Sequence, residues 1–126
     1  TSVLLDRLGP GTPLLPAGAP GPTAFADPGL VESILTSSGW SGVAIAPLDA
    51  NCDYGIDGTD GVEARLTMIL NTGAGRIARA KLEPEIGPDG WAALLDEVRD
   101  ELRANLVDGR VQFNGATWLV TATNPG

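Results

Sequence analysis

The feature that most limits the fold of this chain is its shortage of strand-forming segments. Among 126 residues, only three short runs have the apolar, β-branched or aromatic character of strands. The first runs over 43–47 and ends at Pro47; the others lie at 110–113 and 116–122. Three strands are too few for the usual α/β sheet of about five or six. We therefore expect an incomplete sheet, with a strand count typical of a fragment.

The opening segment differs in composition from the rest. Residues 1–22 hold five of the ten prolines and four glycines. Proline lacks an amide donor and glycine raises the entropy of the unfolded chain, so such a stretch favours a loop. We predict a Pro/Gly-rich arm or linker over 1–22 and an α/β segment over 23–126.

Helical periodicity and end signals predict three helices in that segment. Asp27 is suited to cap a helix and Pro28 to begin it. Asp60 and Glu63 have the spacing of a capping box. The last helix carries a regular apolar stripe that starts at Trp91. The predicted helices span 27–38, 60–72 and 89–107.

The end of the chain has the signature of a terminal β-hairpin over 110–123. Asn114-Gly115 separates two strand-like runs, and Asn-Gly is the pair that a two-residue type I′ turn prefers. The run Trp118-Leu119-Val120 is typical of a strand buried on both faces. The predicted order is therefore arm, helix, strand, helix, helix, hairpin.

Charge and residue types exclude several classes of function. The formal net charge is −8, which makes a nucleic acid or an anionic membrane surface a poor partner. There is no histidine, so Ser-His-Asp and Cys-His triads and His-ligated metals are excluded. Cys52 is the single cysteine, so no internal disulfide can form. No secretory signal and no apolar run long enough to cross a membrane is visible, so we expect a cytoplasmic protein.

Three phrases in the chain resemble the late part of class I S-adenosylmethionine-dependent methyltransferases. The run GPTAFADP at 21–28, with the helix pattern after it, is similar to the family phrase that leads into the sixth sheet strand. The run NGATWLVTA at 114–122 is similar to the family's closing phrase. The run LNTGAGRIAR at 70–79 is similar to a Gly-Pro-x-Ala-Arg segment, with Ala74-Gly75 in place of Gly-Pro. The order and spacing of the three together carry the resemblance, which covers roughly 20–124.

The resemblance implies the C-terminal part of a doubly wound, Rossmann-like sheet with a helical insertion. It implies methyl transfer from S-adenosylmethionine to a small-molecule acceptor, with the insertion over 49–77 covering the acceptor side. The family binds its cofactor in the first half of the fold, through a glycine-rich turn after the first strand. The glycines of 9–11 and 18–21 neither follow a strand nor open a helix. We therefore expect no cofactor and no catalytic residue in this chain alone.

The acidic segment 49–60 admits a second interpretation as a calcium loop. Oxygen-bearing side chains recur there at a spacing similar to EF-hand and dockerin loops. Tyr54 stands where such loops have a glycine, and the segment before Asp49 is strand-like rather than helical. We favour a solvated strand-to-helix connection. The candidate metal ligands are Asp49, Asn51, Asp53, Asp57 and Asp60.

Three further features have a functional and a structural interpretation. Cys52 lies among carboxylates, which disfavour its thiolate, so a nucleophilic role is not expected. The charge run 96–103 is interpreted as a solvated helix face. Trp40, Trp91 and Trp118 are interpreted as core aromatics, and Trp91, near a helix start, is the one most suited to be an exception that stacks on a ligand.

An incomplete sheet leaves an open edge and uncovered apolar surface. We therefore expect a homo-oligomer, formed through the sheet edge or by exchange of an element. A stand-alone self-associating or protein-binding module without catalysis is the alternative to a methyltransferase segment.

Overall fold

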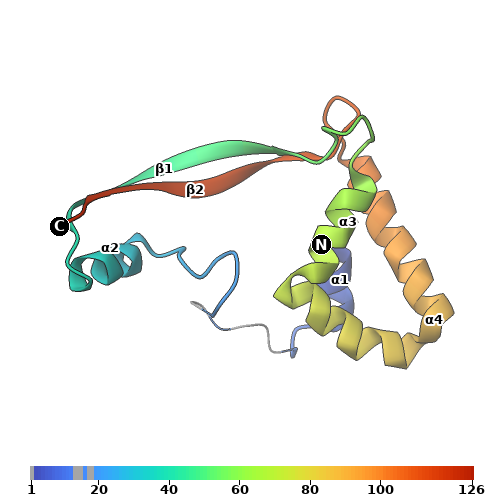
Figure 1. The fold of residues 1–126 in the computed structure, drawn as a ribbon. Helices are drawn as coiled ribbons and strands as arrows, with labels where there is room; N and C mark the ends of the chain where they lie inside the picture. Colours follow the sequence, from blue (N-terminus) through green and yellow to red (C-terminus); the bar gives the residue numbers. More distant parts are fainter. Residues whose placement is uncertain (1, 13–15, 17–18) are drawn as a thin grey trace. The chain divides into compact units, whose positions relative to one another are not determined.

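The computed structural model describes residues 2–12, 16 and 19–126, and these divide into two compact units. The first unit contains the described residues of 1–15 together with 53–113; the second contains those of 16–52 together with 114–126. Within the described residues the fold is mixed α/β, with four helices and a two-stranded antiparallel sheet (Figure 1). The mixed α/β class is confirmed.

The first unit is helical. It contains α1 (Ser2–Leu8), α3 (Val62–Asn71) and α4 (Gly73–Ala104), and α1 and α3 both pack against α4. The core consists of the buried apolar side chains of these helices, which are Leu4, Leu8, Leu66, Ile69, Ala78, Leu82, Trp91, Leu94 and Val98.

Helix α1 corrects the prediction of an unstructured arm over 1–22. Leu4 and Leu8 are one helical turn apart and both are buried in the core. The prolines and glycines of the arm all follow position 8, so the composition of the whole stretch hid a short helix at its start. Residues 1, 13–15 and 17–18 of the predicted arm lie outside the described residues.

Helix α4 joins segments that the sequence separates. It includes 73–79, passes Pro84, and bends at Gly87, whose φ of 73° is not helical. Pro88 follows the bend as the first residue of the second half, where a missing amide donor costs nothing. The predicted helix 89–107 is therefore the second half of α4, which ends at Ala104 (Figure 1).

A close contact fixes the corner between α3 and α4. Thr72 caps α4 by accepting a hydrogen bond from the Gly75 amide at 3.1 Å. A Cβ added at Gly75 would lie 2.0 Å from the carbonyl oxygen of Ile69. Only glycine allows the two backbones to approach this closely.

The second unit contains α2 (Pro28–Ser37) and most of β1 (Ser41–Asp53) and β2 (Gln112–Thr123). Asp27 caps α2 by accepting from the Gly29 amide at 2.8 Å, as its sequence position predicts. Strand β1 is longer than the predicted 43–47 and takes in part of the acidic segment.

The predicted hairpin over 110–123 is wrong. Asn114-Gly115 lies inside β2, which pairs with β1 rather than folding back on itself. The tight turn is instead at Asp108-Gly109, where both residues have positive φ and Val107 and Arg110 exchange backbone hydrogen bonds. Asp-Gly is as good a type I′ pair as Asn-Gly.

The strand pairing has a single antiparallel register. The Tyr54 amide donates to the Val111 carbonyl at 2.9 Å, and the Thr117 hydroxyl donates to the Leu48 carbonyl at 2.5 Å. A Cβ on Gly42 would contact the Thr123 side chain at 3.6 Å, which places these two residues opposite each other in the same register. Even-numbered residues of β1 and odd-numbered residues of β2 therefore direct their backbone groups toward each other. The backbone groups of odd-numbered β1 residues and of even-numbered β2 residues therefore point to the outer edges of the sheet.

Candidate functional site

Three of the five candidate calcium ligands, Asp53, Asp57 and Asp60, serve as local hydrogen-bond acceptors. Asp49 and Asn51 lie at alternate positions of β1, so their side chains point to the same face of the strand. Asp53 accepts from the Gly55 amide at 2.8 Å and pairs with Arg110 at 3.0 Å. The structure brings no three carboxylate or cysteine side chains of the described residues into a metal-binding group.

The other two candidate ligands turn the chain into α3. Asp57 accepts from the backbone and hydroxyl of Thr59 at 3.0 and 2.7 Å, and these bonds hold the pKa of Asp57 below its usual range. Asp60 accepts from the Val62 amide at 3.0 Å. Glu63, expected to complete a capping box, instead pairs with Arg99 of α4 at 2.6 Å. These oxygens act as Asx-turn and helix-start acceptors.

The connection from β1 to α3 is closed by the protein's own atoms. A Cβ on Gly55 would lie 2.7 Å from the Thr59 carbonyl, and one on Gly61 would lie 2.6 Å from the Tyr54 backbone. A cofactor-binding turn needs glycines that leave open space for a ligand. The glycines of this strand-to-helix connection do not provide it.

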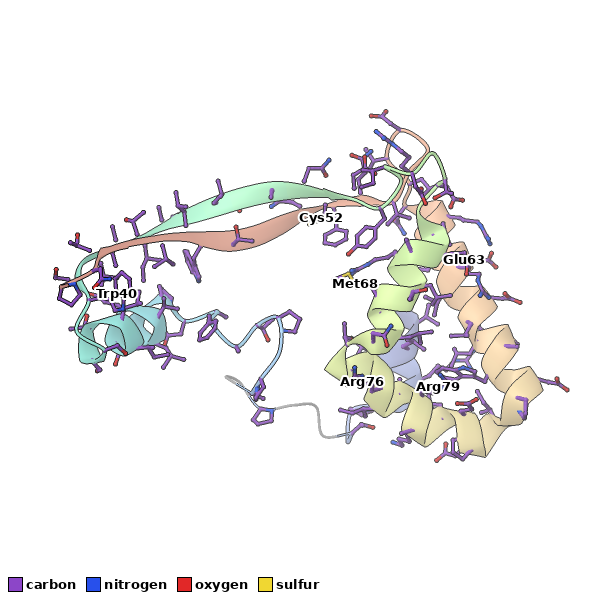
Figure 2. All side chains as sticks on the ribbon, viewed as in Figure 1. Trp40, Cys52, Glu63, Met68, Arg76 and Arg79 are labelled. Carbon is purple, nitrogen blue, oxygen red and sulfur yellow. The ribbon has the colours of Figure 1, made fainter. Side chains whose placement is uncertain are left out.

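A cluster of aromatic rings and an arginine lies within the first unit. Tyr54 and Phe113 stack with ring centroids 5.6 Å apart. The Arg65 guanidinium lies 4.4 Å from the Phe113 ring centroid and 5.4 Å from that of Tyr54. Arg65 and Met68 also contact the Tyr54 hydroxyl, and Met68 projects from α3 (Figure 2). The cluster combines two stacked rings with one positive charge.

Sequence reasoning missed this cluster because Phe113 was assigned to a hairpin. With β2 paired to β1, Phe113 lies opposite Cys52 and close to Tyr54. The available signal was the helical spacing of Arg65 and Met68 on one side of α3. Cys52 itself is a half-buried free thiol.

A shallow concavity of about 560 Å³ lies along α4 before and at its bend. Arg76 and Arg79, labelled in Figure 2, line it together with Glu83 and the prolines 84 and 88. Arg79 is paired with Glu83 at 2.7 Å, and this contact raises the pKa of Arg79. Much of the charge in the concavity is therefore already neutralised.

The charged run 96–103 faces outward, as predicted, and part of it attaches neighbouring helices. Arg7 of α1 pairs with Glu97 at 2.9 Å, and the Ser2 hydroxyl donates to Glu101. Arg99 bridges Asp96 and Glu63, and these two carboxylates raise its pKa. These exposed pairs orient α1 and α3 on α4 but contribute little stability each.

Trp91 is only 6% exposed and belongs to the helical core, so the core interpretation of this tryptophan is confirmed. It lies in the first turn after the bend at Gly87, and its ring is buried with Leu94 and Val98. The expectation about strand burial is wrong. Trp118, Leu119 and Val120, predicted to be buried on both faces, are 38%, 53% and 37% exposed.

One face of the sheet is partly covered by the chain before α2, and the other face is exposed. The Trp118 indole donates to the Ala26 carbonyl at 3.3 Å, so the segment before α2 lies on one face. On that face Val43 and Ile45 are half-buried. Leu48 and Leu119 lie on the opposite face, 49% and 53% exposed. In the described part of the chain, each strand has one partner and one free edge.

Comparison with known proteins gives no relative: no protein family, no curated protein and no solved structure matches this chain. Among the described residues, no helix combines the length and apolar character needed to cross a membrane.

Proposed function

We propose that residues 20–124 are the closing segment of a class I S-adenosylmethionine-dependent methyltransferase that acts on a small-molecule acceptor. The observation that carries the proposal is the order of elements. Helix α2 is followed by β1, a helical insertion made of α3 and α4, and β2. The phrase GPTAFADP leads into α2 and the phrase NGATWLVTA lies in β2. The resemblance implies the same succession of helix, strand, insertion and last strand.

The connection between β1 and α3 offers no open glycine turn to a cofactor. The glycine-containing connection between β1 and α3 is filled by Thr59, Arg110 and Tyr54, so no open turn faces a ligand. The proposal therefore assigns the cofactor to residues outside this segment. Within it, the cluster of Tyr54, Arg65 and Phe113 belongs to the insertion and its flanks, and offers a stacking surface to an aromatic acceptor.

The reading frame that encodes the chain tests this proposal. We expect the codons before Thr1 to encode a strand followed by a glycine-rich turn that opens a helix. A start codon with no such segment before it would contradict the proposal. Calorimetric titration of the 126-residue chain with S-adenosylmethionine gives a second test. Tight binding would show that the cofactor site lies within these residues, contrary to the closed connection at Gly55 and Gly61.

A self-associating module without catalysis is a second candidate, favoured by the free strand edges and the exposed Leu48 and Leu119. Unpaired strand edges seek partners. Size-exclusion chromatography with light scattering should give an oligomer at tens of micromolar. A clean monomer at that concentration would contradict this candidate.

A further inference from the structure

We propose that the outer edge of β2 pairs antiparallel with the same edge of a second copy of this chain, centred on Leu119. The two copies would then share a four-stranded sheet in the order β1, β2, β2 and β1. The inference rests on the self-association candidate and adds which edge associates and in which register.

The outer edge of β1 is unsuited to pairing. In the observed register, odd-numbered residues of β1 direct their backbone groups outward, and Pro47 is one of them. Proline has no amide hydrogen, so it interrupts any ladder added there. Asp49 and Asp53 also belong to this strand, in a chain with net charge −8. Proline and charge are the means by which natural edge strands avoid association.

The outer edge of β2 has neither protection. The sequence from Gln112 to Thr123 contains no proline and no charged residue. Even-numbered residues direct their amides and carbonyls to this edge, since the odd-numbered ones face β1. Trp118 and Val120 are among them, and both are more than one-third exposed.

The sequence of β2 is self-complementary about Leu119. In an antiparallel pair centred there, Thr117 lies opposite Thr121 of the second copy, and Trp118 lies opposite Val120. Ala116 lies opposite Ala122. Threonine pairs and aromatic pairs with β-branched residues are favourable cross-strand neighbours. In this register the even-numbered residues of the two copies exchange backbone hydrogen bonds, and these are the residues whose amides and carbonyls point to the outer edge of β2. The register therefore gives favourable side-chain neighbours and complete backbone hydrogen bonding at the same time.

Such a contact closes on itself. A two-fold axis through the Leu119 pair uses the same edge of both copies, so each copy is satisfied by one partner. The strands left at the two ends are both β1, whose outer edges carry Pro47. Further growth is blocked there, so we expect a dimer rather than a filament.

Paired leucine substitutions test the edge. Leu119→Lys places two like charges opposite each other on the two-fold axis. Leu48→Lys is the control, because Leu48 lies in β1 on the same face of the sheet and is similarly exposed. By light scattering over about 1–100 µM, Leu119→Lys should weaken the dimer roughly tenfold or more, and Leu48→Lys should leave it nearly unchanged. Mixing Leu119→Lys with Leu119→Glu should restore a mixed dimer. Circular dichroism checks that each variant is folded.

Each other outcome has a definite meaning. Equal loss in both lysine variants would show that the sheet faces associate, and would overturn the inference while self-association stands. A dimer insensitive to both variants would indicate element exchange and would also overturn it. A monomeric wild type would refute the inference and the self-association candidate together.

A covalent trap gives the register directly. Residues opposite each other in a non-hydrogen-bonded antiparallel pair have Cα atoms about 4.5 Å apart, which a disulfide can bridge. Under mild oxidation Leu119→Cys should form a disulfide between two copies of residue 119, identified by mass spectrometry. Leu48→Cys is the matched control and should remain largely a thiol. Efficient linkage through Leu48→Cys alone would contradict the proposed edge.

Discussion

The corner between α3 and α4 makes Gly75 the position where the smallest change should have the largest effect. Gly75→Ala adds one methyl group to a buried backbone position. That carbon would lie 2.0 Å from the Ile69 carbonyl oxygen and 2.8 Å from the Leu70 Cα, whereas ordinary contacts begin at 3.4 Å. The obstructing atoms are backbone, so no rotamer change relieves the overlap. The two helices must separate by more than about 1 Å in a closely packed core.

We expect Gly75→Ala to lower the free energy of unfolding by about 3 kcal/mol or more, at the upper end of overpacking effects. Urea unfolding followed by circular dichroism at 222 nm measures this, since most helical residues lie in the first unit. Gly11→Ala is the matched control, because its added carbon meets no atom within 4 Å and its φ is not positive. A loss below about 1 kcal/mol for Gly75→Ala would refute the close approach at this corner.

Three further changes test other parts of the structure. Trp91→Ala should cost about 3–5 kcal/mol of unfolding free energy in the same urea assay, because the ring is buried in the core; a loss no larger than that of an exposed residue would place Trp91 at the surface. Asp27→Ala removes the cap of α2 and should cost about 1 kcal/mol, whereas Asp27→Asn should keep most of it. The Ser2 hydroxyl lowers the pKa of Glu101, so this contact adds stability above the ordinary carboxyl pKa of 4.5 and loses it as the pH falls below that value. Ser2→Ala should therefore lower stability at pH 7, and its effect should shrink as the pH falls below 4.5; an equal loss at neutral and at strongly acidic pH would contradict the assignment.

Signals that act over one helical turn were sufficient to locate the start of α2. Asp27 and Pro28 specify its beginning by geometry that needs no distant partner. The apolar stripe of the second half of α4 was visible for the same reason. The bend at Gly87 was not, because Pro84 and Pro88 signal a break whether the helix stops or continues at an angle.

The strand prediction failed because pairing is decided over long distances. Asn114-Gly115 favours a turn locally, but the residues that compete for β2 lie in β1, about 60 positions earlier. The same error hid the cluster of Tyr54, Arg65 and Phe113, whose members meet only in the long register. Asp108-Gly109 is an equally strong turn signal, and only the structure distinguishes the two.

The long register in turn makes the sheet depend on the helical unit. Closing an unstructured loop of about 60 residues costs roughly 3–4 kcal/mol, more than a two-stranded ribbon readily supplies. Once the helices fold, Tyr54 and Val111 are already joined by a 2.9 Å hydrogen bond, and Arg110 is paired with Asp53 beside them. The two strands can then pair in register without any further entropy cost of loop closure. Destabilising the core should therefore also melt the ladder, whereas melting the ladder leaves α3 and α4 packed. Pairing of β2 with a second copy would stabilise the sheet and, because the ladder forms only on folded helices, would also raise the stability of the helical unit with protein concentration.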